Sequence, residues 1–177
     1  MKRPRAAATS PRETRPRPAA PLLEPDQLSL TQLALFVGQA ADEQLLEQLR
    51  SAGFQDIKVS HGYVVQHLLG GPRAIGELAA LLGVTQQAAS KTAAEMVRAG
   101  YAELIPGEDA RVRQLRLSER GAACVERARS ARKRLEARLS QHVGSESYED
   151  ARRTLGGLLD ALGGSEAVRK RRVRMPR

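Results

Sequence analysis

The sequence is poor in the residues that support disulfides, aromatic cores or membrane insertion. Tryptophan is absent, aromatic residues make up 3%, and the chain has one cysteine and three histidines. A single cysteine excludes an internal disulfide framework, which fits a reducing compartment. The longest uncharged stretch, residues 27–41, is rich in Gln, Ser and Thr. It is too short to cross a bilayer, which needs about 20 apolar residues.

Common catalytic motifs are also missing. The sequence contains no P-loop, no G-x-S-x-G, no H-E-x-x-H and no C-x-x-C. His61 and His67 are six residues apart, a spacing that does not bring both imidazoles to one face of a helix. We therefore expect no enzyme, no cofactor and no metal site.

The N-terminal residues lack the apolar segment of a secretory signal. Their arginines and serines are similar to those of an organellar transit peptide. However, four prolines within residues 1–18 oppose the amphipathic helix that such a peptide needs. We expect a cytoplasmic protein whose residues 1–20 form a disordered basic arm.

The net charge of +9 is concentrated at the two ends of the chain. Residues 1–19 hold six basic residues and one acid, and residues 169–177 hold six basic residues and no acid. Residues 20–168 carry 17 basic and 19 acidic residues, a net charge of −2. A nucleic-acid-binding face in the folded part must therefore depend on where the charges lie, not on their number.

Apolar periodicity predicts two helices in the first third of the chain. Leucine, valine and alanine recur at three- and four-residue steps over residues 28–52, the pattern of an amphipathic helix. A second helix is expected over residues 60–69, with Ser60 as its N-cap. Gly70, Gly71 and Pro72 then interrupt the pattern.

A helix, a tight turn, a second helix and a hairpin are expected next. A short segment, residues 73–75, leads into a helix over residues 76–82. Gly83 makes the turn, and Thr85 caps a helix over residues 86–99. Alternating strands over residues 101–105 and 112–117 flank the turn Pro106-Gly107-Glu108-Asp109. This order predicts a mainly α fold with a small β-hairpin wing, a winged helix-turn-helix.

The helix over residues 86–99 has two unlike faces. Ala89, Ala93, Met96 and Val97 form its apolar face. The other face carries amides and a hydroxyl that can bond to base edges, and cations that can meet phosphates. Small Ala88 and Ala94 would let the helix lie deep in a major groove. The outward side chains are Gln87, Ser90, Lys91, Ala94 and Arg98.

The hairpin adds basic residues, because Arg111, Arg113 and Arg116 lie near its tip. Arginine suits a narrow minor groove. For both the helix and the hairpin, the alternative is a merely solvated polar surface. The combined order of elements favours DNA binding.

Two further helices follow the hairpin. Ser118 is expected to cap a helix over residues 119–140, and a sixth helix is expected over residues 147–162. Both have long apolar stripes that must be covered. The cover is either the same chain or a second copy of it. After Gly163 and Gly164 we expect a disordered basic tail over residues 164–177.

Residues 52–121 resemble the MarR (multiple antibiotic resistance regulator) family. Ala110 departs from it, since the family usually has a second arginine there. The motifs that carry the resemblance are Ala52-Gly53-Phe54, Glu77-Leu78-Ala79-x-x-Leu82-Gly83-Val84-Thr85, Gly100, Asp109-x-Arg111 and Leu117-Ser118-x-x-Gly121.

The resemblance implies a bacterial, sequence-specific DNA-binding transcription regulator, a repressor that binds a pseudo-palindromic operator as a homodimer. It implies that residues 53–121 are the DNA-binding domain, and that residues 21–52 and 119–163 interlock across a two-fold axis. Asp109 would brace Arg111 in the minor groove. The residues expected to contact DNA are Thr85, Gln86, Gln87, Ala88, Ser90, Lys91, Arg98, Asp109, Arg111 and Arg113.

Regulators of this type often release DNA when a small molecule binds between their dimer and DNA-binding parts. Phe36, His61, Tyr63 and His67 are the expected lining residues, each alternatively a core side chain. Cys124 lies on an apolar stripe, so we expect a buried thiol in preference to a redox sensor.

Two other functions remain open. The basic tails are either solvated ends or non-specific phosphate contacts. If they dominate, the protein is a nucleoid-type architectural protein without an effector. A protein-interaction adaptor that lost DNA binding is the third reading, and the pair Lys91 and Arg111 opposes it.

Overall fold

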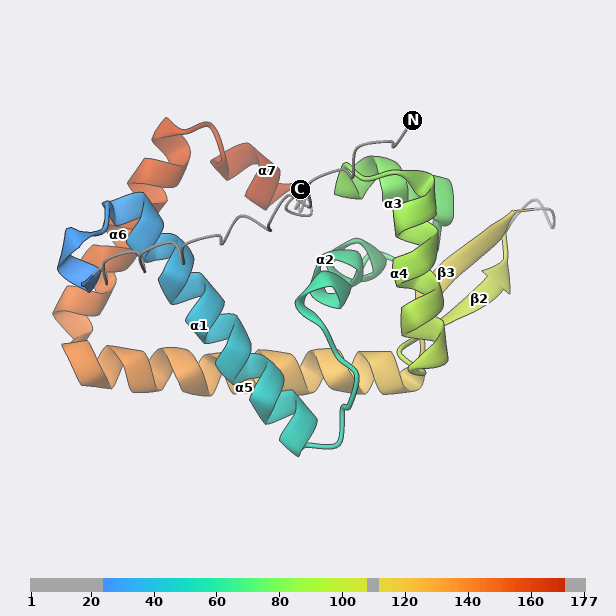
Figure 1. Ribbon diagram of the computed structural model, residues 1–177, viewed down its shortest axis with the longest axis horizontal. Coiled ribbons are helices and arrows are strands. Elements are labelled where there is room, and N and C mark those ends of the chain that lie inside the picture. Colours follow the sequence, from blue (N-terminus) through green and yellow to red (C-terminus); the bar gives the residue numbers. More distant parts are fainter. Residues whose placement is uncertain (1–23, 108–111, 171–177) are drawn as a thin grey trace, which may run out of the picture. The chain divides into compact units, whose positions relative to one another are not determined.

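The computed structural model describes residues 24–107 and 112–170. Helices dominate this part of the chain, which also holds one small sheet (Figure 1). The contacts divide the chain into two units, residues 1–36 and 37–177. The predictions for residues 1–23, 108–111 and 171–177 concern positions outside the described residues.

The described part of the first unit is a short 3₁₀ helix, η1 (Pro25–Gln27), and the first turns of α1 (Leu30–Ser51). The side chain of Gln27 accepts a hydrogen bond from the Glu24 backbone N–H at 3.1 Å. Gln32 accepts one from the Ser29 backbone N–H, also at 3.1 Å. These local bonds satisfy backbone donors at the two helix starts. The first predicted helix is thus confirmed, with each end shifted by one or two residues.

Three short helices follow in the second unit: α2 (Val59–Leu68), α3 (Ile75–Leu82) and α4 (Gln86–Arg98). All three were expected. The prediction that Ser60 caps α2 is wrong, because the N-cap is Lys58, whose backbone is extended and whose side chain makes no capping bond. Nothing in the apolar periodicity could place the helix start to the residue.

The sheet has three antiparallel strands in the order β1-β3-β2, namely β1 (Arg73–Ala74), β3 (Arg113–Leu117) and β2 (Ala102–Pro106). The predicted hairpin is confirmed, and Leu104 lies opposite Leu115 in it. The sequence did not predict β1, since two residues are too few to show the alternation of a strand. The fold class, mainly α with a winged helix, is confirmed.

The core of the second unit lies where α2, α3 and α4 meet the sheet. Leu82, Met96 and Leu115 are fully buried there, and Leu49 of α1 joins the same cluster. Tyr101, between α4 and β2, is the largest buried side chain. The aliphatic side chains that the sequence supplies in place of aromatics therefore pack into one core.

The C-terminal part consists of α5 (Glu119–Val143), α6 (Ser145–Ala161) and α7 (Ser165–Arg169). Figure 1 shows α3, α4 and the sheet at one end of α5 and α6 at the other. Order does not end at Gly163–Gly164 as expected: α7 occupies the start of the predicted disordered tail, so that boundary is corrected. No helix in the described ranges has the length and apolarity needed to cross a membrane.

Candidate nucleic-acid interface

The turn between α3 and α4 is built as the sequence predicts. Gly83 ends α3 in the left-handed region, with φ of 68°, where a side chain would be strained. The hydroxyl of Thr85 accepts a hydrogen bond from the Ala88 N–H at 3.2 Å. This cap fixes the first turn of α4 and therefore the direction in which its side chains project.

The core holds α4 by one face. Ala89, Ala93 and Met96 are 3%, 3% and 0% exposed, and Val97 packs against the same cluster. The opposite face is open to solvent. Its exposed residues include every DNA-contact candidate on the helix and its cap: Thr85, Gln86, Gln87, Ala88, Ser90, Lys91 and Arg98.

The charges on the open face are available to a ligand. Neither Lys91 nor Arg98 forms an ion pair with any described residue. An unpaired cation on a helix that also presents amides and a hydroxyl suits a duplex, because phosphates flank the base edges of a groove.

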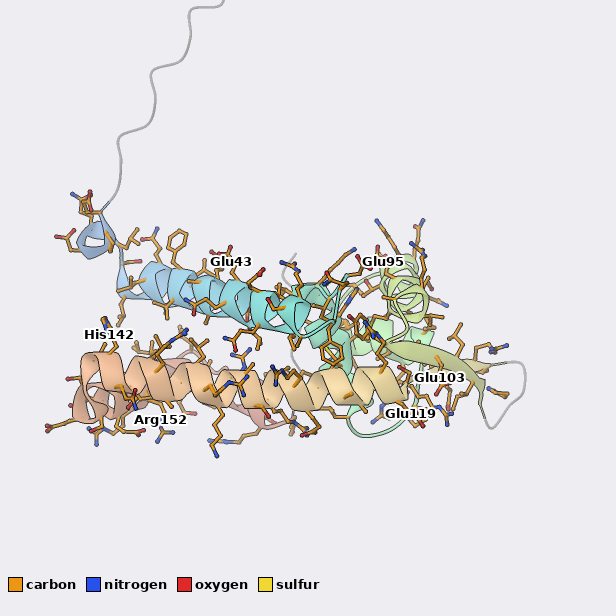
Figure 2. The ribbon with its side chains drawn as sticks, turned by 90° about the horizontal axis from the view of Figure 1, so that it is seen from below. Glu43, Glu95, Glu103, Glu119, His142 and Arg152 are labelled. Atoms are coloured by element: carbon orange, nitrogen blue, oxygen red, sulfur yellow. The ribbon has the colours of Figure 1, made fainter. Side chains whose placement is uncertain are left out.

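Glu95, the only acid of α4, is turned away from that face. Its carboxylate lies 2.7 Å from the Lys58 ammonium at the start of α2. The hydrogen bond and charge of Lys58 lower the pKa of Glu95. No local pattern could predict this pair, since the two residues are 37 positions apart. In Figure 2, Glu95 of α4 lies near the end of α5 that carries Glu119, and His142 lies at the other end of α5.

The wing is closed by a hydrogen bond from the Gly107 N–H to the Val112 carbonyl, at 2.8 Å. Arg113 is exposed, and its guanidinium donates to the Leu104 carbonyl at 3.0 Å. Arg116 pairs with Glu103 across the hairpin at 2.8 Å, so its charge is partly compensated. Asp109 and Arg111, the tip residues expected to contact DNA, lie outside the described ranges.

Close contacts join α5, the loop before α2 and the segment between α4 and β2. The Tyr101 hydroxyl donates to the Gln55 carbonyl at 2.5 Å, and Arg120 of α5 donates to the Gly53 carbonyl at 2.8 Å. A Cβ on Gly121 would lie 2.0 Å from the Tyr101 carbonyl oxygen. Gly121 is thus required by a close approach of two backbones, which gives a physical reason for a glycine that the sequence singled out only as a motif position.

A cavity of about 470 Å³ lies within the second unit, between α1, α2 and α5. Leu45, Leu49, Val125 and Ala128 are among its lining residues. Of the expected ligand-binding residues, only Tyr63 lines it. His61 and His67 are buried in the core, and Phe36 is exposed in the first unit.

Cys124 also lines the cavity, with 5% of its surface exposed. Burial raises the pKa of its thiol, which keeps it protonated and weakly nucleophilic near neutral pH. The expectation of a buried thiol is confirmed.

The comparisons agree with this geometry. Residues 55–111 match the model of the MarR family. The reduced form of MarR from E. coli is 25% identical, with a TM-score of 0.59 over 76% of this chain and 96% of that chain. YusO from Bacillus subtilis is 23% identical, with a TM-score of 0.60 over 75% and 92% of the two chains.

A third structure, RV1404 from Mycobacterium tuberculosis, is 20% identical, with a TM-score of 0.61 over 76% of this chain and 92% of that chain. No curated protein matches the sequence. The family match confirms the resemblance inferred from the motifs, and the solved structures show that the fold is shared well beyond the matched segment.

Proposed function

We propose that this chain, which carries a MarR-family segment at residues 55–111, is a DNA-binding transcription regulator that acts as a homodimeric repressor. The observation that supports this most directly is α4. One face of the helix is buried in the core, and the other presents unpaired cations, amides and a hydroxyl to solvent. Such a helix can enter a major groove without leaving any apolar side chain uncovered.

The cations and the amides have different roles in this proposal. Lys91 and Arg98 contact phosphates and supply affinity that falls with salt. Gln86, Gln87 and Ser90 contact base edges and supply specificity. Thr85 and Ala88 begin the helix at the groove. Arg113 and the tip residues Asp109 and Arg111 contact the neighbouring minor groove.

The unpartnered face of α6 supports a dimer. Leu155, Leu158, Leu159 and Leu162 are 44%, 37%, 40% and 77% exposed, and no residue of α6 is buried. A second copy of the chain would cover them. The two copies of α4 would then be related by a two-fold axis. The operator would therefore be a pseudo-palindrome with half-sites about one helical turn apart, roughly 34–36 Å.

The cavity supports release by a small molecule. Its volume, about 470 Å³, lies within the range of about 300–1,000 Å³ that is typical of ligand pockets. Charges at its rim are already paired, Arg132 with Asp42 at 3.3 Å and Lys58 with Glu95 at 2.7 Å. The expected effector is therefore a largely apolar small molecule. The site of action is the cytoplasm, with no enzymatic step.

The test is genome-wide mapping of binding sites, followed by footprinting on the strongest site. We expect one protected palindrome at moderate salt, and loss of protection in a Lys91→Ala, Arg98→Ala double variant. Arg153→Ala, which removes an exposed arginine of α6, is the matched control. Uniform coating of random DNA by the wild type would instead indicate an architectural protein that uses its basic ends.

Effector release is tested on the same site. Apolar small molecules are screened for loss of protection, and a hit is repeated on Ala128→Phe, which fills the cavity. We expect this variant to bind DNA without responding. Ala122→Phe, on the same helix but outside the cavity, should respond normally. An equal response of both variants would place the effector elsewhere.

A further inference from the structure

The strongest observation that the proposed function leaves unused is a buried histidine behind α4. His61 of α2 is 1% exposed. Neither of its ring nitrogens has a hydrogen-bond partner among the described residues. A buried imidazole normally forms a hydrogen bond through at least one nitrogen. Without such a bond, the ring is tolerated in the core only in its neutral form, because burying the charged form costs far more free energy.

The nearest charge belongs to α4 itself. The His61 Nε2 atom lies 3.9 Å from the Glu95 Oε2 atom, which is too long for a hydrogen bond. The same Oε2 atom is held at 2.7 Å by Lys58. His61, Lys58 and Glu95 therefore form a cluster that joins the start of α2 to the inner side of the DNA-contacting helix.

The remaining surroundings of His61 are uncharged. The ring of Tyr101 lies 6.4 Å away, centroid to centroid, and its hydroxyl is engaged with the Gln55 carbonyl. The elements packed against α2 contribute apolar side chains to the shared core, such as Leu78 of α3 and Leu115 of β3. Lys91, one turn before Glu95 on α4, acts on that carboxylate. Among the described residues, Lys58 and Glu95 are the charged groups that act on the ring itself.

We propose that His61 is a proton-sensitive latch between α2 and α4: protonation places a charge without hydrogen-bond partners in the core, draws Glu95 away from Lys58, and weakens DNA binding by displacing α4. The inference rests on the proposed function, because it gives that function a regulatory input. An imidazolium has two N–H donors. Among the described residues, no acceptor lies within hydrogen-bond distance of either donor. Relief requires movement of the ring, of Glu95, or of both.

The direction with pH follows from the burial. Desolvation lowers the pKa of His61 below its ordinary value of 6.5, Lys58 lowers it further, and Glu95 raises it. The folded state thus binds this proton less readily than the unfolded state. Stability is complete above about pH 6.5 and is lost as the pH falls from there through the lowered folded-state pKa.

Few other groups can produce such a response. The chain has three histidines, and histidine is the side chain whose ordinary pKa lies between about pH 5 and 8. Protonating a solvent-exposed histidine would add positive charge and strengthen binding to DNA. A loss of affinity on acidification is therefore the opposite of the generic effect.

The experiment measures operator affinity and the thermal unfolding midpoint of the full chain at steps from about pH 8 to pH 5. For the wild type we expect operator affinity to fall several-fold on acidification, with a parallel drop in the unfolding midpoint, because the same proton disfavours the folded arrangement of α2 and α4. His61→Leu should abolish both changes. His142→Gln, on the distant end of α5 (Figure 2), should retain them.

Two variants outside the buried core, at Lys58 and Glu95, keep the test decisive if His61→Leu does not fold. Lys58→Met removes the charge that opposes protonation, so the transition should move to higher pH. Glu95→Gln removes the charge that favours protonation, so the transition should move to lower pH. NMR titration of the His61 ring resonances reports the same shifts without DNA.

The outcomes separate the two hypotheses. A protein that binds DNA with no loss on acidification, or whose loss persists in His61→Leu, overturns the latch and leaves the regulator intact. A protein that binds no specific DNA at any pH overturns the regulator. In that case the unfolding midpoints and ring titrations decide whether the latch between α2 and α4 exists.

Discussion

Helices α4 and α6 are both amphipathic, but only α4 has its apolar face covered by other parts of the same chain. The apolar side of α4 is buried to the last few per cent, at Ala89, Ala93 and Met96. The apolar side of α6 and its C-cap, Leu162, have four leucines between 37% and 77% exposed. The chain therefore covers the apolar face of α4 and leaves its polar face in solvent, whereas it leaves the apolar face of α6 uncovered.

The largest expected effect is on association through α6. Leu158→Asp combined with Leu162→Asp should convert a dimer to monomers, raising the dissociation constant by about a thousandfold or more, since each buried leucine contributes about 1.5–3 kcal/mol and a two-fold interface contains each twice. Sedimentation velocity measures this. Helical content by circular dichroism should be retained, because no residue of α6 is buried in its own chain.

Arg153→Glu is the control for association, because this exposed side chain pairs only locally with Asp150. It should leave the dissociation constant within about threefold, as expected for a surface ion pair. A wild-type chain that sediments as a monomer at high concentration would contradict the interpretation of α6.

The next effect is on the buried face of α4. Met96→Ala leaves a cavity in the core and should lower the free energy of unfolding by about 2–5 kcal/mol, measured by urea denaturation. Gln87→Ala on the exposed face should change it by less than about 0.5 kcal/mol. Equal losses in the two variants would mean that the faces of α4 are not as different as their burial indicates.

The helix starts provide a smaller contrast. Thr85→Ala removes the side chain that accepts from the Ala88 N–H and should cost about 1 kcal/mol. The N-cap of α6 is Gly144, without a side-chain bond, so Ser145→Ala should cost much less. Thermal unfolding distinguishes them. A cost for Ser145→Ala as large as that for Thr85→Ala would falsify this difference in capping between α4 and α6.

The smallest effect on stability is expected at the outer face of α4. Lys91→Ala should change the free energy of unfolding by less than about 0.5 kcal/mol, since the side chain has no ion-pair partner among the described residues. Its effect should appear in DNA binding, where the slope of log affinity against log salt falls by about one. Arg153→Ala should leave that slope unchanged.

Much of the segment from α3 to the wing could be predicted, because the sequence patterns that specify it are local. Gly83 and Thr85 mark the turn and the cap with their own backbone chemistry, and the step of Ala89, Ala93 and Met96 sets the buried face. The outward set that includes Lys91 follows from the same phase. The strand β1 was missed, because two residues carry no period and form a strand only by pairing with β3.

The cluster behind α4 could not be predicted for a different reason. Packing between helices brings Lys58, His61 and Glu95 together. Their positions in the sequence do not indicate that they are in contact. The expectation that His61 lines a ligand site was a reasonable use of a polar residue on an apolar helix. The fold places it instead in the core, where an imidazole without partners becomes sensitive to protons.

Residue type and period were enough to predict the helix–turn–helix–wing order, the outward face of α4 and the location of the excess charge at the two ends of the chain. The folded structure was needed to show which apolar faces the chain covers for itself, where the cavity lies, and that Glu95 turns from the exposed face of α4 toward Lys58 and His61. The reason is that burial and pairing between distant residues are properties of packing, which no local pattern records.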